Sequence, residues 1–192
     1  DLDYVGVKAP QFSFTRLKGS DPVLGVEMAS TGEVACLGDD FNEAFLKSLI
    51  SVGFNLPNKN ILVSAGPLDS KVGFLKSMKI LEKMGFHFYA TRGTAEFIEK
   101  NGMKAEVLHW PLEDKEPNAL SYLRDGKIDF VINIPENIEK EELDNDYLIR
   151  RKAIDMNVSL ITNLQLAKRF VEALSRTSID DLKVKSWDEY HL

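Results

Sequence analysis

The sequence predicts an α/β protein, built on a parallel sheet of roughly five strands with helices on both faces. Two observations lead to this fold class. From residue 39 onward, short apolar runs alternate with segments that have helical spacing of their apolar residues. The apolar runs are nearly continuous, which is typical of parallel strands buried on both faces of a sheet.

The first 38 residues have a different character. They contain strand-like runs at residues 4–7, 11–14 and 23–28, with a turn-rich stretch at 18–22. So short a stretch, with few apolar residues, cannot easily build a core of its own. We therefore predict a boundary at residue 38, with a β-rich tail before it and an α/β unit over 39–192. Because the chain begins with Asp1, we expect it to be a piece of a larger polypeptide.

The α/β unit is expected to open with a helix that Asp39 and Asp40 cap and that closes at Gly53. Strands and helices then alternate. The strands are expected at residues 61–65, 86–90, 105–109, 129–134 and 158–162, and the helices at 71–84, 95–100, 118–124, 147–156 and 164–176. The acidic stretch 136–146 is predicted to be a solvated loop.

Composition excludes several classes of function. The formal charge of −6 and the lack of a basic patch argue against nucleic-acid binding. No apolar run is long enough to span a bilayer, so no membrane partner is expected. The single Cys36 cannot form an internal disulfide and suits the reducing cytoplasm. No Gly-x-x-x-x-Gly-Lys loop and no metal-binding cluster is present in the sequence.

Four polar or aromatic residues follow the predicted strands, namely Ser64, Thr91, Trp110 and Asn133. Ligands of parallel sheets bind at the carboxyl ends of the strands, so these side chains should meet at one edge. In the motif Ala90-Thr91-Arg92-Gly93-Thr94 two threonines fall at the start of a helix. Unpaired N–H groups and the helix dipole favour an anion there. The alternative is that both threonines merely cap the helix.

Two stretches carry a resemblance to a known family. Residues 22–34 resemble the end of the second synthetase half of carbamoyl-phosphate synthase large subunits. The motif at 90–94, with Asp146-Tyr147-Leu148-Ile149-Arg150-Arg151, resembles the allosteric domain that follows that half. The resemblance implies a Rossmann-like, methylglyoxal-synthase-like regulatory domain over 39–192, with 1–38 as the end of an ATP-grasp unit.

The same resemblance implies the context of the domain. The parent enzyme makes carbamoyl phosphate from bicarbonate, ammonia or glutamine, and two ATP, with Mg or Mn, for pyrimidine and arginine biosynthesis. Expected partners are a small anionic effector, the synthetase halves of the same polypeptide, a glutaminase small subunit and, as an open alternative, a second copy of the chain. The fragment itself is expected to hold no ATP, metal or catalytic residue.

Carried over residue by residue, the effector site of the family gives nine positions here. They are Ser64, Lys71, Thr91, Gly93, Thr94, Trp110, Asn133, Glu136 and Asp146. Trp110 resembles the tryptophan that the urea-cycle enzymes, which bind N-acetylglutamate, have at this position. Glu136 and Asp146, however, stand where those enzymes have asparagine, and acids oppose a dianionic ligand. A nucleotide of the UMP or IMP type is therefore slightly preferred over N-acetylglutamate.

The competing interpretation is an enzyme, a methylglyoxal-synthase-type phosphate lyase with the same threonine turn. That enzyme has a Gly-Gly-Asp loop after the third strand, whereas this chain has Trp110-Pro111-Leu112-Glu113-Asp114-Lys115. Proton abstraction needs a positioned base. Glu113 and Asp114 are the only candidates that the segment offers.

Overall fold

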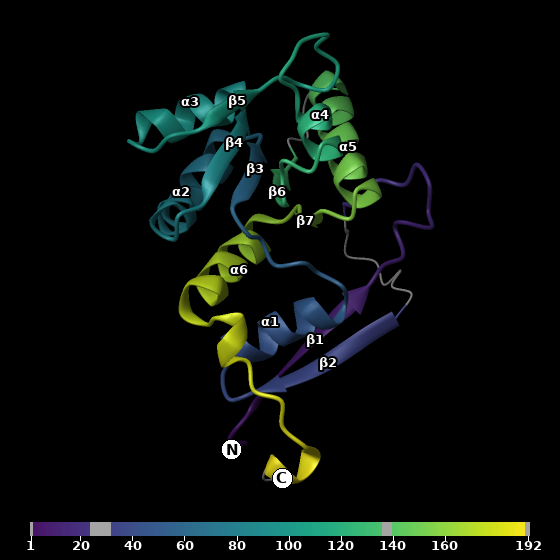
Figure 1. The fold of residues 1–192 in the computed structure, drawn as a ribbon, viewed down its shortest axis with the longest axis vertical. Coiled ribbons are helices and arrows are strands. Elements are labelled where there is room, and N and C mark those ends of the chain that lie inside the picture. Colours follow the sequence, from purple (N-terminus) through teal and green to yellow (C-terminus); the bar gives the residue numbers. More distant parts are fainter. Residues whose placement is uncertain (1, 24–31, 136–139, 191–192) are drawn as a thin grey trace.

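The computed structural model of the chain describes residues 2–23, 32–135 and 140–190. It has two parts (Figure 1). The upper part holds a five-stranded sheet with most of the helices, and the lower part holds a two-stranded sheet with one helix. Both chain ends lie at the lower end of the molecule.

The larger sheet is parallel throughout, with the strand order β5-β4-β3-β6-β7. The strands are β3 (Asn60–Ala65), β4 (His87–Thr91), β5 (Glu106–Leu108), β6 (Phe130–Ile134) and β7 (Ser159–Ile161). The prediction of a parallel sheet with helices on both faces is confirmed. The chain leaves β3 toward β4 on one side and later returns to place β6 on the other, so the order reverses at β3.

The two faces of this sheet are covered by different helices. On one face, α2 (Leu68–Lys83), α3 (Arg92–Lys100) and α6 (Leu164–Arg176) pack over residues such as Ile61 and Ile132. On the other, α4 (Ala119–Arg124) and α5 (Lys140–Asp155) pack over their neighbours Leu62 and Val131. Burial of successive residues on opposite faces explains why these strands have continuous apolar sequences.

The lower part consists of β1 (Val5–Gln11), β2 (Gly32–Gly38) and α1 (Phe41–Ser51). The two strands are antiparallel and both contact α1. Asp40 caps α1 as expected, since its carboxylate accepts a hydrogen bond of 2.9 Å from the Glu43 N–H. β2 was not predicted, because a sheet that packs on one side only needs few apolar residues. The predicted strand at 23–28 lies almost wholly outside the described residues.

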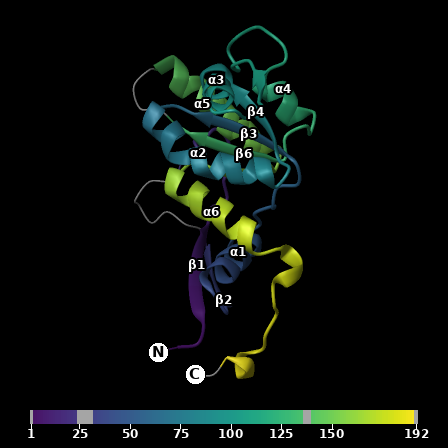
Figure 2. The same ribbon diagram turned by 90° about the vertical axis from the view of Figure 1, so that its left-hand side faces the viewer.

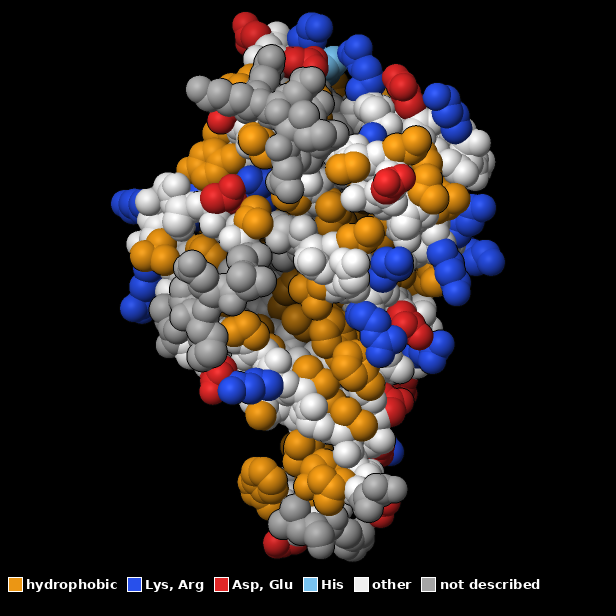
Figure 3. Space-filling model, turned by 180° about the vertical axis from the view of Figure 1, so that it is seen from behind, with side chains coloured by type: hydrophobic (Ala, Val, Ile, Leu, Met, Phe, Trp, Pro, Cys, Tyr) orange, Lys and Arg blue, Asp and Glu red, His pale blue; other side chains and the backbone are white. Residues whose placement is uncertain are grey.

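Helix α6 joins the two parts, because it contacts both α1 and α2 (Figure 2). Three aromatic rings meet at this junction. The Phe54 ring lies 5.8 Å from that of Phe130 and 5.3 Å from that of Phe170, and the latter two are 5.1 Å apart. Seen from behind, hydrophobic side chains gather along the middle of the molecule (Figure 3). One apolar core therefore runs from α1 to the sheet.

One prediction about the helices is wrong. Residues 140–146, expected to be part of a solvated acidic loop, form the first turns of α5. Their charge suggested full solvation, but Asn145 and Asp146 are buried. The charge of a segment predicts exposure only on average, and a helix turns some of its polar residues toward the protein.

Candidate functional site

A small cavity of about 130 Å³ lies at the carboxyl edge of the large sheet, and we call it the edge pocket. Its lining residues come from the ends of β3 and β4, the starts of α2 and α3, the loop after β5, and α5. They are Ser64, Ala65, Gly66, Lys71, Thr91, Gly93, Thr94, Trp110 and Asp146.

Seven of the nine predicted site residues line this pocket. The eighth, Asn133, is fully buried beside it and donates a hydrogen bond of 2.6 Å to the Asp146 carboxylate. The ninth, Glu136, lies outside the described residues. Residues up to 82 positions apart meet here, as Ser64, predicted from its strand end, and Asp146, implied by the family resemblance, do.

The pocket is located where the strand order reverses. Ser64 on β3 and Asn133 on β6 are register partners across the two adjacent strands. Both lie on the face covered by α5, at alternate positions from Leu62 and Val131. In open α/β sheets this reversal leaves a crevice outside the carboxyl ends of the strands, which is where ligands bind.

The two threonines of the turn do not act as helix caps. Thr91 is the residue that precedes α3, but its side chain makes no capping hydrogen bond. Its hydroxyl donates instead to the Ser64 hydroxyl at 3.4 Å. Thr94 accepts a hydrogen bond of 3.2 Å from the Ala65 N–H and donates one of 3.3 Å to the Ala65 carbonyl. The capping interpretation is therefore wrong. The Thr91 side chain accepts no hydrogen bond from the first backbone N–H groups of α3.

Lys71 supplies the positive charge of the pocket. It is half-buried on the first turn of α2, and its ammonium group makes no hydrogen bond or ion pair with any residue that the structure describes. A Cβ atom placed on Gly93 would lie 3.6 Å from the Lys71 Nζ, so the ammonium group reaches the start of α3. The amino-terminal ends of two helices and a lysine therefore meet at one small cavity.

Beneath the pocket, buried polar side chains form a connected network. The Ser64 hydroxyl donates to an Asp146 oxygen at 3.2 Å, the same oxygen that the Asn133 amide reaches. The Asn133 amide oxygen accepts a hydrogen bond of 2.9 Å from Arg150. Thr91, Ser64, Asn133, Asp146 and Arg150 are each at most 3% exposed. Such groups are stable in the interior because each is hydrogen-bonded.

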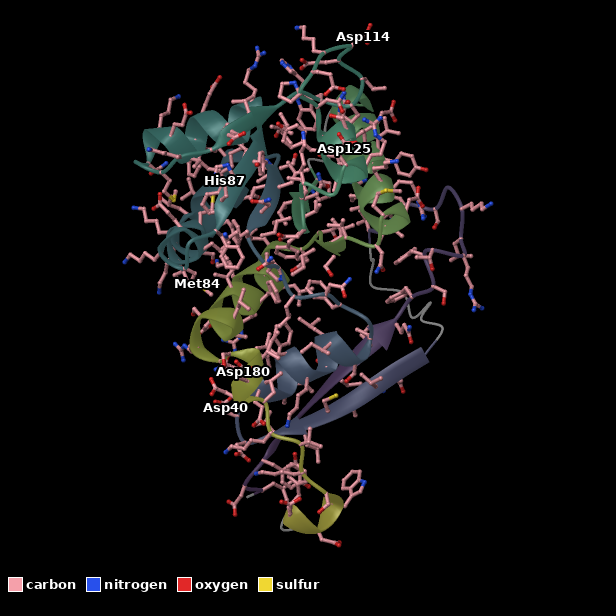
Figure 4. The ribbon with its side chains drawn as sticks, in the orientation of Figure 1. Asp40, Met84, His87, Asp114, Asp125 and Asp180 are labelled. Carbon is pink, nitrogen blue, oxygen red and sulfur yellow. The ribbon has the colours of Figure 1, made fainter. Side chains whose placement is uncertain are left out.

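Trp110 lines the pocket from the loop that joins β5 to α4. Leu112 ties this loop to α5, since its N–H donates to the Asn145 side chain at 2.8 Å. The two proposed bases lie elsewhere: Glu113 contacts His109 at 2.8 Å, and Asp114 is exposed in the outer part of the loop (Figure 4). The carboxylate that does line the pocket is Asp146.

Arg150 is the contributor that sequence reasoning did not include among the nine site residues. The signal was present, because Asp146 and Arg150 are four residues apart and therefore share one face of a helix. Two grooves are larger than the edge pocket, about 560 Å³ and 430 Å³. Neither contains a predicted site residue.

Comparison with known proteins assigns part of the chain to a family. Residues 73–162 match the family model of the MGS-like domain. The chain contains an MGS-like domain. The matched range begins in α2 and ends just after β7, so it includes five of the nine residues that line the edge pocket, but not Lys71.

The chain as a whole has relatives among much longer proteins. Over 179 residues, or 91% of the chain, it is 48% identical to multifunctional protein pyr1-3 of Dictyostelium discoideum. It is 44% identical over 98% of the chain to the mitochondrial carbamoyl-phosphate synthase [ammonia] of Aquarana catesbeiana, and 42% identical over 98% to multifunctional protein URA2 of Saccharomyces cerevisiae. The chain spans 8%, 12% and 9% of these three proteins, respectively.

These matches confirm the resemblance that the two sequence motifs indicated. Within the described ranges, no helix is long and apolar enough to cross a membrane. The same ranges contain no group of three or more His, Cys, Asp or Glu side chains that could hold a metal ion.

Proposed function

We propose that the chain is the effector-binding regulatory domain of a carbamoyl-phosphate synthase and that it binds a small anionic ligand in the edge pocket. The observation that carries this proposal is Lys71. A half-buried lysine that pairs with none of the residues that the structure describes is unusual, because buried charges are normally paired. Here it lies between two helix starts, where an anion is favoured.

The size of the pocket supports binding of an anionic group rather than of a whole large ligand. Its 130 Å³ is well below the roughly 300–1,000 Å³ of typical ligand pockets. A phosphate or carboxylate would meet Lys71, the hydroxyl of Thr91 and the N–H groups at Gly93. The rest of the ligand would extend past Trp110, whose ring is available for stacking on a base.

Between the two classes of effector, we favour a nucleotide of the UMP or IMP type over N-acetylglutamate. The buried Asp146 carboxylate lines the pocket, and a negative charge at short range opposes the second carboxylate of a dicarboxylic ligand. A nucleoside monophosphate places its charge in one phosphate group. Its sugar and base offer hydrogen-bond donors instead.

The wider context of the proposal comes from the relatives. We propose that the domain acts on synthetase halves of the same polypeptide, which would hold ATP with Mg or Mn, and on a glutaminase subunit through them. From the same context we propose that a second copy of the chain is a partner and that the protein is located in the cytoplasm. The effector would change the activity by binding one conformation of the whole enzyme more tightly than another. The coupling free energy would be about 1–3 kcal/mol.

The test is a binding experiment with inorganic phosphate, UMP, IMP and N-acetylglutamate, read by thermal shift and titration calorimetry. A ligand that binds only the folded chain raises its melting temperature in a concentration-dependent way. Lys71→Met should weaken binding by roughly tenfold or more, because it removes a charge-assisted contact. Lys76→Met, on the exposed side of the same helix, is the matched control. Equal binding by both variants would contradict the proposal.

The second candidate function is the phosphate lyase, and Asp146 is the observation that favours it. This residue brings a carboxylate into the pocket that Glu113 and Asp114 do not supply. Incubation with dihydroxyacetone phosphate distinguishes the two functions. Release of methylglyoxal that Asp146→Asn abolishes would establish the lyase. No release, together with effector binding, is the result that we expect.

A further inference from the structure

Arg150 connects the edge pocket to a distant part of the chain. Its guanidinium group is bound on one side to the Asn133 amide oxygen, at 2.9 Å, and on the other to Asp21. The contact with Asp21 is bidentate, with N–O distances of 2.8 and 2.5 Å. Four hydrogen-bonded side chains therefore lie between the pocket wall at Thr91 and the carboxylate of Asp21, 129 residues before Arg150.

Asp21 belongs to a segment that lies against α5, which we call the 14–21 segment. Arg151 donates to the carbonyl groups of Phe14, Leu17 and Ser20 at 3.1 to 3.3 Å. The Tyr147 hydroxyl donates to the Gly19 carbonyl at 3.0 Å. These contacts attach the segment to α5 but do not reach the pocket. Only Arg150, among the described residues of this contact, also bonds to a residue of the pocket network.

We propose that Arg150 and Asp21 are positioning residues for the edge pocket, so that attachment of the 14–21 segment and binding of an anion favour each other. This inference rests on the proposed anion-binding function. Asp21 fixes the guanidinium group of Arg150, which is 3% exposed, and this in turn fixes the orientation of the Asn133 amide. The amide then holds the Asp146 carboxylate at 2.6 Å.

An anion that enters the pocket repels Asp146 and therefore needs that carboxylate to be held by donors. The Asn133 amide and the Ser64 hydroxyl are such donors, and Arg150 adds a fixed positive charge behind them. Without Asp21 the guanidinium group loses its carboxylate partner and its fixed position. The amide of Asn133 is then free to turn, and the pocket accepts an anion less readily. By linkage, a bound anion must strengthen the attachment of the segment by the same factor.

The decisive experiment compares phosphate and UMP affinities of the 192-residue chain and its Asp21→Asn variant. We expect the dissociation constants to rise about fivefold or more in the variant. The sign of the change is informative. Removal of the negative charge of Asp21 would reduce Coulomb repulsion of an anion and so tighten its binding. Weaker binding therefore points to the positioning role. Asp21→Glu, which keeps the carboxylate, should recover most of the lost affinity.

Tyr147→Phe is the matched control, because it removes one contact of the 14–21 segment that has no connection to the pocket. It should change the affinities far less than Asp21→Asn does, because the segment stays attached through Arg150 and Arg151. Hydrogen exchange gives an independent measurement on the unaltered chain. Phosphate should slow exchange of the Leu17 and Ser20 amides, which are hydrogen-bonded within the segment.

The outcomes separate this inference from the function on which it rests. Unchanged or tighter binding by Asp21→Asn would overturn the positioning role and leave the anion pocket in place. Failure of the unaltered chain to bind phosphate and every effector tested would overturn both. The Asp21 side chain is 41% exposed, and the Arg151 contacts do not involve it, so the variant is expected to fold.

Discussion

Two segments that belong to neither sheet are held against the body of the molecule by charged side chains, and they are held in different ways. The 14–21 segment is bound by Arg150 and Arg151, which are 2% and 8% exposed. The carboxy-terminal tail, residues 177–190, is bound through Asp39, whose carboxylate pairs with Lys183 at 2.9 Å and also with Lys185. The Asp39 and Lys183 side chains are exposed, and that of Lys185 is partly so.

The difference teaches which of the two attachments has a fixed geometry. A buried charge must keep its partners, because the interior offers no water to replace them. An exposed ion pair competes with water and salt, and it contributes little to stability. The arginine contact can therefore transmit a change in position to the edge pocket, whereas the lysine contact only keeps the tail close to α1.

Replacement of the buried arginine should have the largest effect on stability. Arg150→Met leaves the Asn133 amide oxygen without its donor and Asp21 without its cation. We expect the free energy of unfolding to fall by about 2–3 kcal/mol, measured by urea denaturation. Asp39→Asn, on the other segment, should leave the denaturation midpoint unchanged. Similar losses in both variants would remove the distinction between the segments.

The two threonines of the pocket also differ in how much they contribute to stability, although the expected effect is smaller. Thr94 satisfies the buried Ala65 N–H, so Thr94→Ala should lower stability by about 1–2 kcal/mol. Thr91 makes only a long hydroxyl contact of 3.4 Å, so Thr91→Ala should change stability little but weaken phosphate binding by roughly tenfold. Denaturation and calorimetry on both variants separate these roles. Equal stability losses would show that Thr91 is structural too.

The smallest expected effect is a release of the tail in acid. Hydrogen bonds from Lys183 and Lys185 lower the pKa of Asp39 from 3.8 to about 2. The stabilising contribution is complete above pH 4 and is lost as the pH falls toward 2, since protonation removes the carboxylate charge. Fluorescence of Trp187 in a Trp110→Phe variant should report the release. With Asp39→Asn, the signal should no longer change between pH 4 and 2.

Sequence reasoning succeeded where burial imposes a pattern. Helix α6 is found over the predicted residues 164–176, and the five strands of the large sheet lie within two residues of their predicted positions. The rule that ligands bind at strand ends brought Ser64, Thr91 and Trp110 to one cavity. These predictions depend on local composition and on the geometry of parallel sheets.

The remaining features depend on contacts between distant residues, which a single sequence does not contain. β2 was missed because its residues are only partly buried. The start of α5 was missed because six charged or polar residues over 140–146 were taken as solvated. The pairing of Arg150 with Asp21 joins residues 129 positions apart. Local patterns cannot indicate such a pairing, and they did not place Asp146 on the same helix as Arg150.

The cluster of Phe54, Phe130 and Phe170 has a consequence for how the molecule melts. Phe54 follows the helix of the lower part, Phe130 begins a central strand, and Phe170 lies in the middle of α6. Neither part can lose its structure without exposing rings on which the other depends. Heat should therefore denature both parts in a single cooperative transition, and scanning calorimetry should show one endotherm whose calorimetric and van't Hoff enthalpies agree.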